Sequence, residues 1–376
     1  MGRSSYKRDI PIMKSVRFKI LHVVTTIERG GAENQLLILV REQVAAGHEV
    51  TVLGLKGRTE LRNEFLSLGI HLDTTLLNRS FIRQVFLLKT LLRKKWHIVH
   101  SHLPRAEVLV FMARPKIPWV TTRHNAEPFL PRNPLGISYL LSRLVLIRCK
   151  KVIAISMAVN SFLLRSREVK SKGEIVVIRY GIRRTRHKSL NLCQTAVPQS
   201  TLDLVTISRL SPQKDLPTLI RAFKVVEAQI PDSRLRIAGE GPLRTSLMSL
   251  VSQLGLSRKV KFLGKVSDTE QLLSQSDVFI LTSLYEGFGL VLLEAMNCNL
   301  PIVACRNEAV LEVLGSDYVG LAATSSPEDV ARLTLEMRDP IFRNNAISQI
   351  SKRIVLFDSQ EMSQHIEAVY RDISVV

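Results

Sequence analysis

The sequence predicts an α/β protein built from two doubly wound parallel sheets, and three observations support this prediction. The chain has 376 residues, more than one hydrophobic core usually supports, so two domains are expected. Short apolar runs alternate with helical patterns along both halves, which is typical of parallel sheets covered by helices. The segment 278–304 shows this unit most clearly, because an apolar run, a glycine-containing loop, a leucine-rich helix and a second apolar run follow one another.

The N-terminal half contains the first strand and helix units. A strand is predicted at 18–24, and a loop with Gly30 and Gly31 leads into a helix at about 32–46. Gly47 then occupies the position at which a left-handed residue usually ends a helix, and a second strand is predicted at 48–55. The other predicted elements of this half are helices at 83–95 and 135–149 and strands at 97–102, 119–124, 151–156 and 174–181.

The C-terminal half repeats the alternation of strands and helices. Between the halves, residues 184–199 are basic and polar without a clear period, so we expect them to form the interdomain linker. Residues 1–16 are basic and contain no apolar stretch, so we expect a tail and no secretory signal. The strands predicted in the C-terminal half are 204–208, 234–240, 260–265, 278–283, 301–305 and 318–324.

Two carboxylates make the segment 278–304 chemically informative. Glu286 lies in the glycine-containing loop, and Glu294 lies about a turn and a half into the helix that begins near Gly289. Glycines allow backbone N–H groups to approach a ligand closely, and a helix N-terminus carries partial positive charge, so this loop suits a phosphate. Carboxylates accept hydrogen bonds from hydroxyl groups. Phosphate and hydroxyl recognition in one loop predict a sugar nucleotide as the ligand.

This segment resembles the Glu-x7-Glu signature of the retaining glycosyltransferases of family 4, which have the GT-B fold. Four further blocks, at 20–53, 204–226, 234–247 and 259–268, follow in the order that the family shows. The resemblance covers roughly residues 18–370. It implies two Rossmann-like domains facing across a cleft: an acceptor domain at 17–183, a nucleotide-sugar-binding domain at 200–356, and a terminal helix at 357–376 that crosses back to the first domain.

The resemblance implies roles for residues of the C-terminal half. Arg209 and Lys214 match the basic pair that binds the donor diphosphate, where two cations can replace a metal ion. Glu294 matches the glutamate that binds the ribose hydroxyls, and Glu286 matches the one that lies against the donor sugar. The loop and helix start that meet the sugar and the diphosphate are matched by Phe288, Gly289, Leu290 and Val291, and the backbone that binds the base by Leu263 and Val266.

Residues of the N-terminal half complete the expected site. Gly30 and Gly31 resemble the loop that faces the donor phosphates, and His124 resembles the histidine that reaches the donor sugar, so His124 joins Glu286, Arg209 and Lys214 as an expected catalytic residue. His102 ends a predicted strand, where this fold places ligand contacts, and we expect it to contact the acceptor. The His-x-His spacing of His100 and His102 is also compatible with a metal site. No third ligand is indicated and no Asp-x-Asp triplet occurs, so we expect no metal.

The activity that the resemblance implies is metal-independent transfer of a sugar, with retention at the anomeric carbon, from a nucleotide diphosphate to a hydroxyl. We expect a UDP-sugar rather than a GDP-sugar, and a glycan or lipid-linked glycan acceptor in surface polysaccharide or lipopolysaccharide biosynthesis. An epimerase or phosphorylase of the same fold remains an alternative. A catalytically inactive sugar-nucleotide-binding protein is another, although Arg209, Lys214, Glu286 and Glu294 are all present.

Positive charge is concentrated in the N-terminal half. The formal net charge is +20, and the segment 79–188 alone holds 24 basic and 4 acidic residues. Such a field attracts anionic partners. A solvated basic face without a partner is one alternative, and nucleic acid is disfavoured because no nucleic-acid-binding module is recognisable. We expect an anionic membrane surface or a phosphate-bearing lipid acceptor.

Location follows from the same features. The apolar stretch 137–147 is interrupted by polar residues and is too short to span a bilayer. The four cysteines form no Cys-x-x-Cys pair, so free thiols in a reducing compartment are expected. We therefore expect a peripheral protein on the cytoplasmic face of the inner or plasma membrane.

Overall fold

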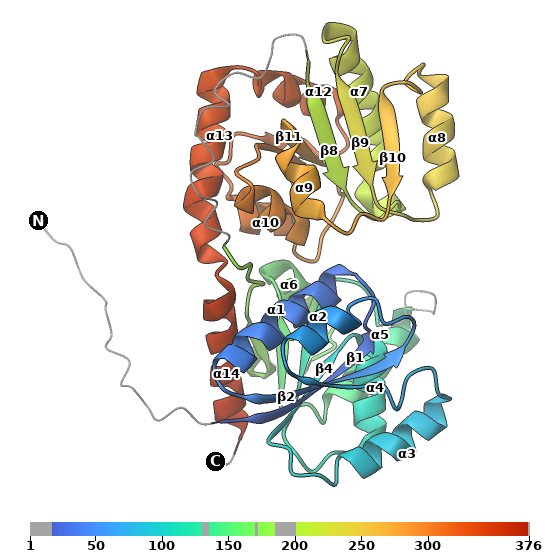
Figure 1. The fold of residues 1–376 in the computed structure, drawn as a ribbon, viewed down its shortest axis with the longest axis vertical. Coiled ribbons are helices and arrows are strands. Elements are labelled where there is room, and N and C mark those ends of the chain that lie inside the picture. Colours follow the sequence, from blue (N-terminus) through green and yellow to red (C-terminus); the bar gives the residue numbers. More distant parts are fainter. Residues whose placement is uncertain (1–16, 130–134, 170–171, 185–200, 375–376) are drawn as a thin grey trace, which may run out of the picture.

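Two parallel sheets, each covered by helices, form two domains that lie one above the other in Figure 1. The computed structural model describes residues 17–129, 135–169, 172–184 and 201–374. The architecture confirms the predicted fold class, two doubly wound α/β domains of the GT-B type. The predicted tail at 1–16, and the predicted linker at 184–199 except for its first residue, lie outside the described residues.

The N-terminal sheet has the strand order β3-β2-β1-β4-β5-β6-β7, and every described pair is parallel. Its central strand β1 is buried on both faces: Ile20 and Val24 belong to one apolar cluster, and Leu21 and Val23 to another. Burial on both faces explains why its sequence is a continuous apolar run. The strands are β1 (Lys19–Thr26), β2 (Glu49–Lys56), β3 (His71–Asp73), β4 (Ile98–His102), β5 (Trp119–Arg123), β6 (Lys151–Ala154) and β7 (Ile175–Val177).

The helices of the N-terminal domain cover both faces of this sheet. Helices α3, α4 and α5 pack side by side on one face, and α1 packs on the other. Gly47 has φ 87° just after α1, which confirms the predicted end of that helix. The helices are α1 (Gly31–Ala45), α2 (Arg62–Ser67), α3 (Phe81–Leu91), α4 (Pro104–Ala113), α5 (Leu135–Leu146), α6 (Met157–Arg165) and the 3-10 helix η1 (Lys172–Glu174).

The C-terminal sheet has the order β10-β9-β8-β11-β12-β13, again with parallel pairs in the described residues. Its strands are β8 (Asp203–Ile207), β9 (Arg234–Ala238), β10 (Val260–Gly264), β11 (Val278–Leu281), β12 (Ile302–Cys305) and β13 (Leu321–Ala322). Its helices are α7 (Leu216–Gln229), α8 (Arg244–Gln253), α9 (Thr269–Ser274), α10 (Leu290–Asn297), α11 (Glu308–Leu314), α12 (Pro327–Glu336), α13 (Pro340–Arg353), and the 3-10 helices η2 (Pro212–Lys214) and η3 (Ile354–Leu356).

Each sheet has a point at which the strand order reverses. In the N-terminal sheet, β1 lies beside β4, and in the C-terminal sheet, β8 lies beside β11. Ligands of open parallel sheets bind outside the carboxyl ends of the strands at such a point. The loops that follow these strands carry Gly30 and Gly31 in the first domain, and Lys214 and Glu286 in the second. The fold therefore brings the expected site residues to the two topological switch points.

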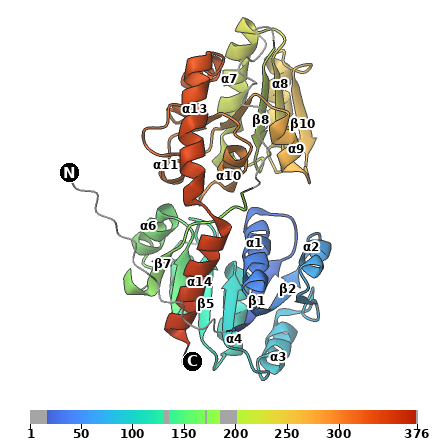
Figure 2. The ribbon, with the colours of Figure 1, turned by 60° about the vertical axis from the view of Figure 1, so that its left-hand side comes forward.

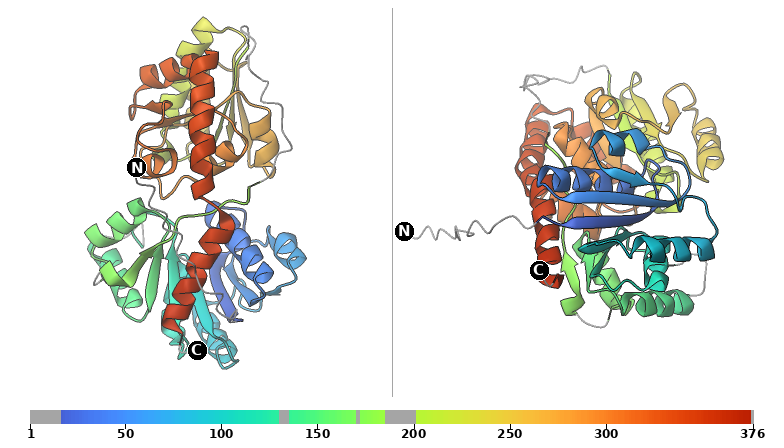
Figure 3. Two further views of the ribbon diagram at one scale, coloured as in Figure 1. Left: turned by 90° about the vertical axis from the view of Figure 1, so that its left-hand side faces the viewer. Right: turned by 60° about the horizontal axis from the view of Figure 1, so that its bottom comes forward.

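The chain passes between the domains at two places that lie side by side. The backbone N–H of Ile182 donates to the Phe357 carbonyl at 2.8 Å, and that of Ser359 donates to the Ile182 carbonyl at 3.3 Å. Helix α14 (Ser359–Ile373) then packs against α1 of the first domain. Figures 2 and 3 show α13 and α14 following one another along one side of both domains. The C-terminal helix thus belongs to the N-terminal domain in space.

The described helices also bear on the membrane and redox expectations. Within 17–129, 135–169, 172–184 and 201–374, no helix has both the length and the hydropathy needed to cross a bilayer. Cys149, Cys298 and Cys305 are free thiols. Asn299 has φ 52°, so an asparagine takes the left-handed conformation just after α10.

Candidate active site

The loop at 208–215 joins β8 to α7 and is braced by the turn after β9. Gly239 in that turn has φ 128°, and a Cβ atom there would collide with the carbonyl oxygen of Ser208. Only glycine permits this approach, because an L side chain would be strained and would meet the neighbouring backbone. Gly239 therefore fixes the path of the loop that carries Arg209 and Lys214. Sequence analysis did not single out this glycine, although the Gly-Glu-Gly-Pro turn was a signal for it.

Lys214 and Glu286 form a partly buried ion pair between the two loops at the switch point. Lys214 Nζ lies 2.5 Å from Glu286 Oε1, and Glu286 is only 8% exposed. The hydroxyl of Thr282 donates to the Lys214 carbonyl at 2.9 Å, which ties the loop after β11 to the loop after β8. Arg209 is exposed. The structure therefore places a paired cation and an exposed cation at the carboxyl end of β8.

Helix α10 begins at this ion pair. Gly289 precedes its first residue with φ 83° and ψ 54°, a left-handed conformation that glycine adopts at little cost. The backbone N–H groups of Leu290 and Val291 are among the first of the helix, and such groups have no partner within the helix. The side chain of Phe288 is buried instead, with its ring centroid 5.3 Å from that of Tyr180 in the other domain. The start of α10 therefore offers backbone N–H donors to a ligand, whereas the Phe288 side chain packs against Tyr180 of the other domain.

Glu294 lies further along α10 than Glu286 and in a different environment. Its side chain is partly buried, and burial raises the pKa of its carboxyl group, while a hydrogen bond with the Thr269 side chain opposes that shift. At the other end of the site, Leu263 is exposed near the end of the edge strand β10, and Val266 is partly buried against the core. The expected sugar, ribose and base contacts thus lie along one edge of the C-terminal sheet.

The N-terminal domain closes over the start of α10. A Cβ atom at Gly31 would lie 3.3 Å from Leu290 Cδ1, and one at Gly287 would lie 3.0 Å from the His124 carbonyl oxygen. The hydroxyl of Ser156 donates to the Gly287 carbonyl at 2.5 Å. The loop of Glu286 is therefore held between the glycine loop after β1 and the segment after β5, as the resemblance implies for a site between the domains.

The glycine loop carries a carboxyl group of its own. Gly30 packs against the Glu33 carboxyl group, which accepts a hydrogen bond from the Thr26 hydroxyl. Glu33 is 8% exposed, and burial raises the pKa of its carboxyl group.

A chain of buried polar side chains runs from the interface into the N-terminal domain. His124 Nδ1 accepts a hydrogen bond from the Tyr180 hydroxyl, and His124 Nε2 lies 3.1 Å from His102 Nδ1. His102 Nε2 lies 2.9 Å from His22 Nδ1, and His22 Nε2 lies 2.8 Å from Gln43 Oε1. Burial lowers the pKa of His22 to about 4 and, with the Arg123 charge, that of His124 to about 3. Burial also lowers the pKa of His102 well below its usual value, so these rings are neutral at pH 7.

The amide of Gln43 gives the hydrogen bonds of this chain one direction. The amide oxygen accepts, so His22 carries its proton on Nε2 and its Nδ1 is an acceptor. His102 must then donate from Nε2 and accept at Nδ1, and His124 must do the same. The amide nitrogen in turn donates to the Tyr370 hydroxyl on α14 at 3.3 Å. A side chain on α1 thus determines which nitrogen of His124 accepts.

The same histidines are close enough to hold a metal ion. One nitrogen from each of His22, His100 and His102 lies within 4.8 Å of the others. The two ring nitrogens of His100 lie 2.6 Å from the Tyr370 hydroxyl and 2.7 Å from the Thr122 hydroxyl. With the contacts given above, both nitrogens of all three rings face hydrogen-bond partners. We interpret the cluster as a hydrogen-bond network, and the expectation of a metal-free protein stays a prediction.

The placement of His102 differs from the sequence expectation. His102 is 2% exposed, and both of its ring nitrogens face other histidines. It lies behind His124 rather than at the surface, so its ring does not offer an atom to an acceptor in this conformation. The sequence located it correctly at the end of β4, but strand position alone does not reveal which residues cover a side chain.

Comparison with known proteins identifies the family of each half. Residues 29–186 match the family model described as Glycosyltransferase Family 4, and residues 193–353 match the model described as Glycosyl transferases group 1. Together these matches include the glycine loop, both glutamates and the basic pair. The two models thus correspond to the two domains of the fold.

Individual relatives and structures agree with these matches. The N-acetyl-alpha-D-glucosaminyl L-malate synthase of Bacillus anthracis is 29% identical over 180 residues, and the match spans about half of that relative and of this chain, 47% of each. The phosphatidylinositol N-acetylglucosaminyltransferase GPI3 subunit of Saccharomyces cerevisiae is 25% identical over 369 residues, which are 92% of this chain and 80% of that protein.

Among solved structures, Anabaena Alr3699/HepE in complex with UDP and glucose superposes with a TM-score of 0.78 at 20% identity, covering 95% of this chain and 100% of that chain. An identity at this level shows the shared fold. Because the two family models account for both domains and the fold agrees with them, the chain belongs to the group 1, family 4 glycosyltransferases of the GT-B type.

Proposed function

We propose that this protein is a retaining glycosyltransferase that moves a sugar from a UDP-sugar to a hydroxyl group of a glycan or a lipid-linked glycan. The observation that carries the proposal is the partly buried Lys214–Glu286 pair at the start of α10, held against Gly31 and His124 of the other domain. This arrangement combines a cation, helix N–H donors and a hydroxyl-binding carboxylate in one interdomain site.

The donor diphosphate is bound by positive charge and N–H groups. Arg209 is exposed and able to turn toward phosphate oxygens, which a guanidinium binds in a bidentate manner. Lys214 adds a point charge, and the first N–H groups of α10 add the field of a helix N-terminus. These groups stabilise the charge that develops on the leaving diphosphate, so we propose that no metal ion is required. The Glu294 carboxylate accepts hydrogen bonds from the ribose hydroxyls.

Support for uridine comes from structural relatives. Anabaena Alr3699/HepE has been crystallised with UDP and with UDP-glucose, and the complexes superpose with TM-scores of 0.75 and 0.78. In this chain, the backbone near Leu263 and Val266, at the edge of the C-terminal sheet, would bind the base. We therefore propose a UDP-sugar as the donor.

Retention is proposed to follow a front-face route. A double displacement needs a carboxylate nucleophile beside the anomeric carbon. Glu286 is the carboxylate in position. Its ion pair with Lys214 stabilises the negative charge of the carboxylate, and a nucleophile would have to give up part of that charge to the new bond. We propose instead that the leaving phosphate accepts the proton of the acceptor hydroxyl while Glu286 binds the donor sugar.

His124 is proposed to bind the donor sugar in a fixed orientation. Its Nδ1 is an acceptor because the hydrogen bonds from Gln43 onward leave it no proton. A sugar hydroxyl is able to replace the Tyr180 hydroxyl as the donor to this nitrogen, and the direction of the remaining bonds is then unchanged. On this basis His102 is a positioning residue that holds His124.

The first prediction concerns the donor and the stereochemistry. In a panel of UDP-, GDP- and ADP-sugars, a UDP-sugar should raise the melting temperature most, because a ligand that binds only the native state stabilises it. With that donor and a hydroxyl acceptor, NMR of the product should show the anomeric configuration of the donor. An inverted linkage would exclude the proposed mechanism. Release of UDP at the same rate without an acceptor would exclude transfer.

The acceptor is proposed to be presented at a membrane. The GPI3 relative is named a phosphatidylinositol N-acetylglucosaminyltransferase, and a Campylobacter jejuni relative, 31% identical over 119 residues, is named for a diphospho-undecaprenol glycan. In this chain α5 exposes Leu140 (71%) and Leu144 (50%) together with Arg143. An exposed helix face that combines apolar and basic side chains suits an anionic bilayer surface. We propose a peripheral protein of the cytoplasmic membrane face, acting in surface polysaccharide or lipopolysaccharide synthesis.

The second prediction is salt-sensitive membrane binding. In flotation experiments at 0.1 M salt, the protein should bind vesicles that contain phosphatidylglycerol and should ignore vesicles of pure phosphatidylcholine. At 1 M salt the binding should fall sharply, because the Debye length shrinks from about 10 Å to about 3 Å. Equal binding to both vesicle types, or none at low salt, would leave a soluble acceptor as the better proposal.

A further inference from the structure

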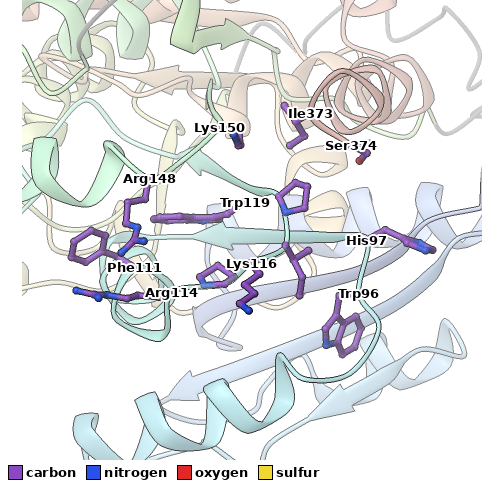
Figure 4. A pocket seen from close by; sticks show the side chains of 13 residues that line it. Trp96, His97, Phe111, Arg114, Lys116, Trp119, Arg148, Lys150, Ile373 and Ser374 are labelled. Atoms are coloured by element: carbon purple, nitrogen blue, oxygen red, sulfur yellow. The ribbon is translucent and has the colours of Figure 1, made fainter. Parts of the chain in front are cut away.

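A second concave site lies at the end of the N-terminal domain that faces away from the interdomain site. It is a pocket of about 510 Å³ at the amino ends of β4, β5 and β6, beside the end of α14. Its volume is within the range of small-ligand sites. Figure 4 shows that basic and aromatic side chains surround it. None of the roles proposed for the active site involves these residues.

The lining of this pocket is strongly basic. Arg114, Lys116, Arg148 and Lys150 contribute four permanent positive charges, and no acidic residue lines the pocket. All four side chains are exposed, and none has a carboxylate within 4.0 Å among the residues that the structure describes. The ion pairs beside the pocket involve other cations: Lys151 pairs with Asp372 at 3.7 Å, and Lys19, which lies over the Trp96 ring, pairs with Glu49 at 2.5 Å. Four unpaired cations around one hollow repel one another unless an anion is bound between them.

Helix ends do not account for this amount of charge. Helices α4 and α5 both end at this pocket, and each C-terminus is equivalent to about half a negative charge, which one nearby cation would balance. Four cations leave a net charge of roughly +3 after both helix ends are counted. Two prolines, Pro115 and Pro118, fix the backbone on either side of Lys116. The two prolines therefore restrict the backbone of the charged loop.

Apart from His97 and Ser374, the rest of the lining is apolar and favours an anion that carries an apolar group. Trp119 is 2% exposed and forms the base of the hollow together with Trp96 and Phe111. Arginine and lysine side chains bind phosphate oxygens, and aromatic rings pack against apolar or glycerol groups. The exposed face of α5 continues from Leu140 through Leu144 to Ile147, next to Arg148 in the pocket. A ligand bound here therefore has an apolar surface beside it along which acyl chains are able to lie.

We propose that this pocket binds the phosphate group of an anionic phospholipid headgroup. The inference rests on the proposed membrane association and goes beyond it, because it assigns the contact to one built site rather than to the overall charge of the domain. Helix α5 runs from the segment after β5, at the interdomain end, to this pocket. A lipid held here would place the apolar face of α5 on the bilayer.

The test compares two double variants with equal loss of charge. Arg114→Gln/Arg148→Gln removes two arginines from the pocket, and the matched control Arg79→Gln/Arg83→Gln removes two exposed arginines, one just before α3 and one within it, outside both the pocket and α5. In flotation at 0.1 M salt with phosphatidylglycerol vesicles, the pocket variant should lose on the order of tenfold more affinity than the control, since it loses direct hydrogen bonds to phosphate as well as charge. Equal losses would overturn the proposal in favour of general surface charge.

Two further measurements keep the outcomes distinct. The increase in melting temperature with UDP should be the same in both variants and in the wild type, which shows that fold and donor site are intact. A soluble probe, sn-glycerol 3-phosphate, separates a lipid from a free phosphate ester. If this probe stabilises the wild type but not the pocket variant, while vesicle affinity is unchanged in that variant, the lipid proposal is wrong. Its failure would leave the glycosyltransferase proposal untouched, because that proposal is tested by sugar transfer.

Discussion

Replacing Lys214 with methionine should lower kcat by on the order of 10²–10³-fold, the loss typical of removing one preorganised group from a developing negative charge. Methionine keeps most of the volume of lysine and removes its charge. Because Lys214 lies in the loop after β8 and 2.5 Å from Glu286, it is positioned between the donor sugar and the diphosphate of the proposed complex. Steady-state kinetics with the donor identified by thermal shift would measure the effect.

The loss of the charge also has a structural consequence. Glu286 is buried, and removing the partner of a buried charge costs about 3–5 kcal/mol, so the Lys214→Met variant should be less stable as well. The double variant Lys214→Met/Glu286→Gln removes both charges, and should recover most of the stability while remaining inactive. This pair of variants separates catalysis from folding.

A matched lysine provides the control for Lys214. Lys224 lies on α7, immediately after the same loop, and pairs with Glu227 at 3.2 Å on the protein surface. Surface pairs contribute about 1 kcal/mol or less, so Lys224→Met should leave kcat and stability nearly unchanged. If Lys214→Met retains wild-type kcat with normal stability, Lys214 has no part in the chemistry.

The site residues that sequence could find share a local signature. Glu286, Gly289 and Glu294 belong to one strand, loop and helix unit, so their relative positions follow from the period of the helix and the length of the loop. The switch-point position of Lys214 also follows once the strands are recognised, because parallel strands place their carboxyl ends at one edge.

The residues that sequence could not find depend on contacts between distant segments. His22 on β1 lies opposite His100 on β4, a pairing set by the strand order and not by the sequence near either residue. Gln43 on α1 joins the same network from another element. Likewise, the contact of Gly287 with the His124 backbone exists only after the two domains have packed. Such contacts between distant segments cannot be inferred when each segment of the sequence is considered alone.

Short elements were missed for a different reason. Helix α2 has 6 residues and β3 has 3, too few for a period of 3.6 or 2 to become recognisable. The helix predicted at 83–95 is α3, which begins at Phe81 and ends at Leu91. Three consecutive basic residues follow shortly after Leu91. Because basic side chains are favourable at a helix C-terminus, the sequence predicted that the helix continues through them, past its actual end.

The buried histidines predict that the N-terminal domain loses stability sharply in mild acid. Burial lowers the pKa of His22 to about 4, and the pKa values of His100 and His102 lie well below 6.5. Unfolding exposes these rings, so between about pH 4 and 6.5 the unfolded chain binds more protons than the native one, and the free energy of unfolding falls as the pH falls. Above pH 6.5 these groups no longer contribute a slope.

The size of the effect follows from the shifts. For His22 the shift corresponds to about 3 kcal/mol over the whole window, at 1.36 kcal/mol per pKa unit. Between pH 7 and pH 5, His22 and His124, whose pKa values are about 4 and about 3, each lower the free energy of unfolding by about 2 kcal/mol, which is a substantial part of the stability of a typical domain. The buried carboxyl groups of Glu33 and Glu107 oppose this trend, because burial raises their pKa values and makes stability fall as the pH rises.

Tryptophan fluorescence can measure this loss in the N-terminal domain alone, because Trp96 and Trp119 are the only tryptophans of the chain and both lie there. In urea titrations at pH 7, 6 and 5, the unfolding midpoint should fall steeply below pH 6.5.

Two variants test whether the histidine network causes this fall. His22→Gln removes one titrating ring from the network and should reduce the dependence of the midpoint on pH, even though the variant is less stable at pH 7. The control His71→Gln changes an exposed residue on β3 and should leave the slope unchanged. A proton on His22 or His102 would turn its acceptor nitrogen into a second donor that faces the N–H of the next ring, so the native network does not tolerate a proton on either ring. A midpoint that stays constant from pH 7 to 5 would therefore contradict both the neutral network and its fixed direction.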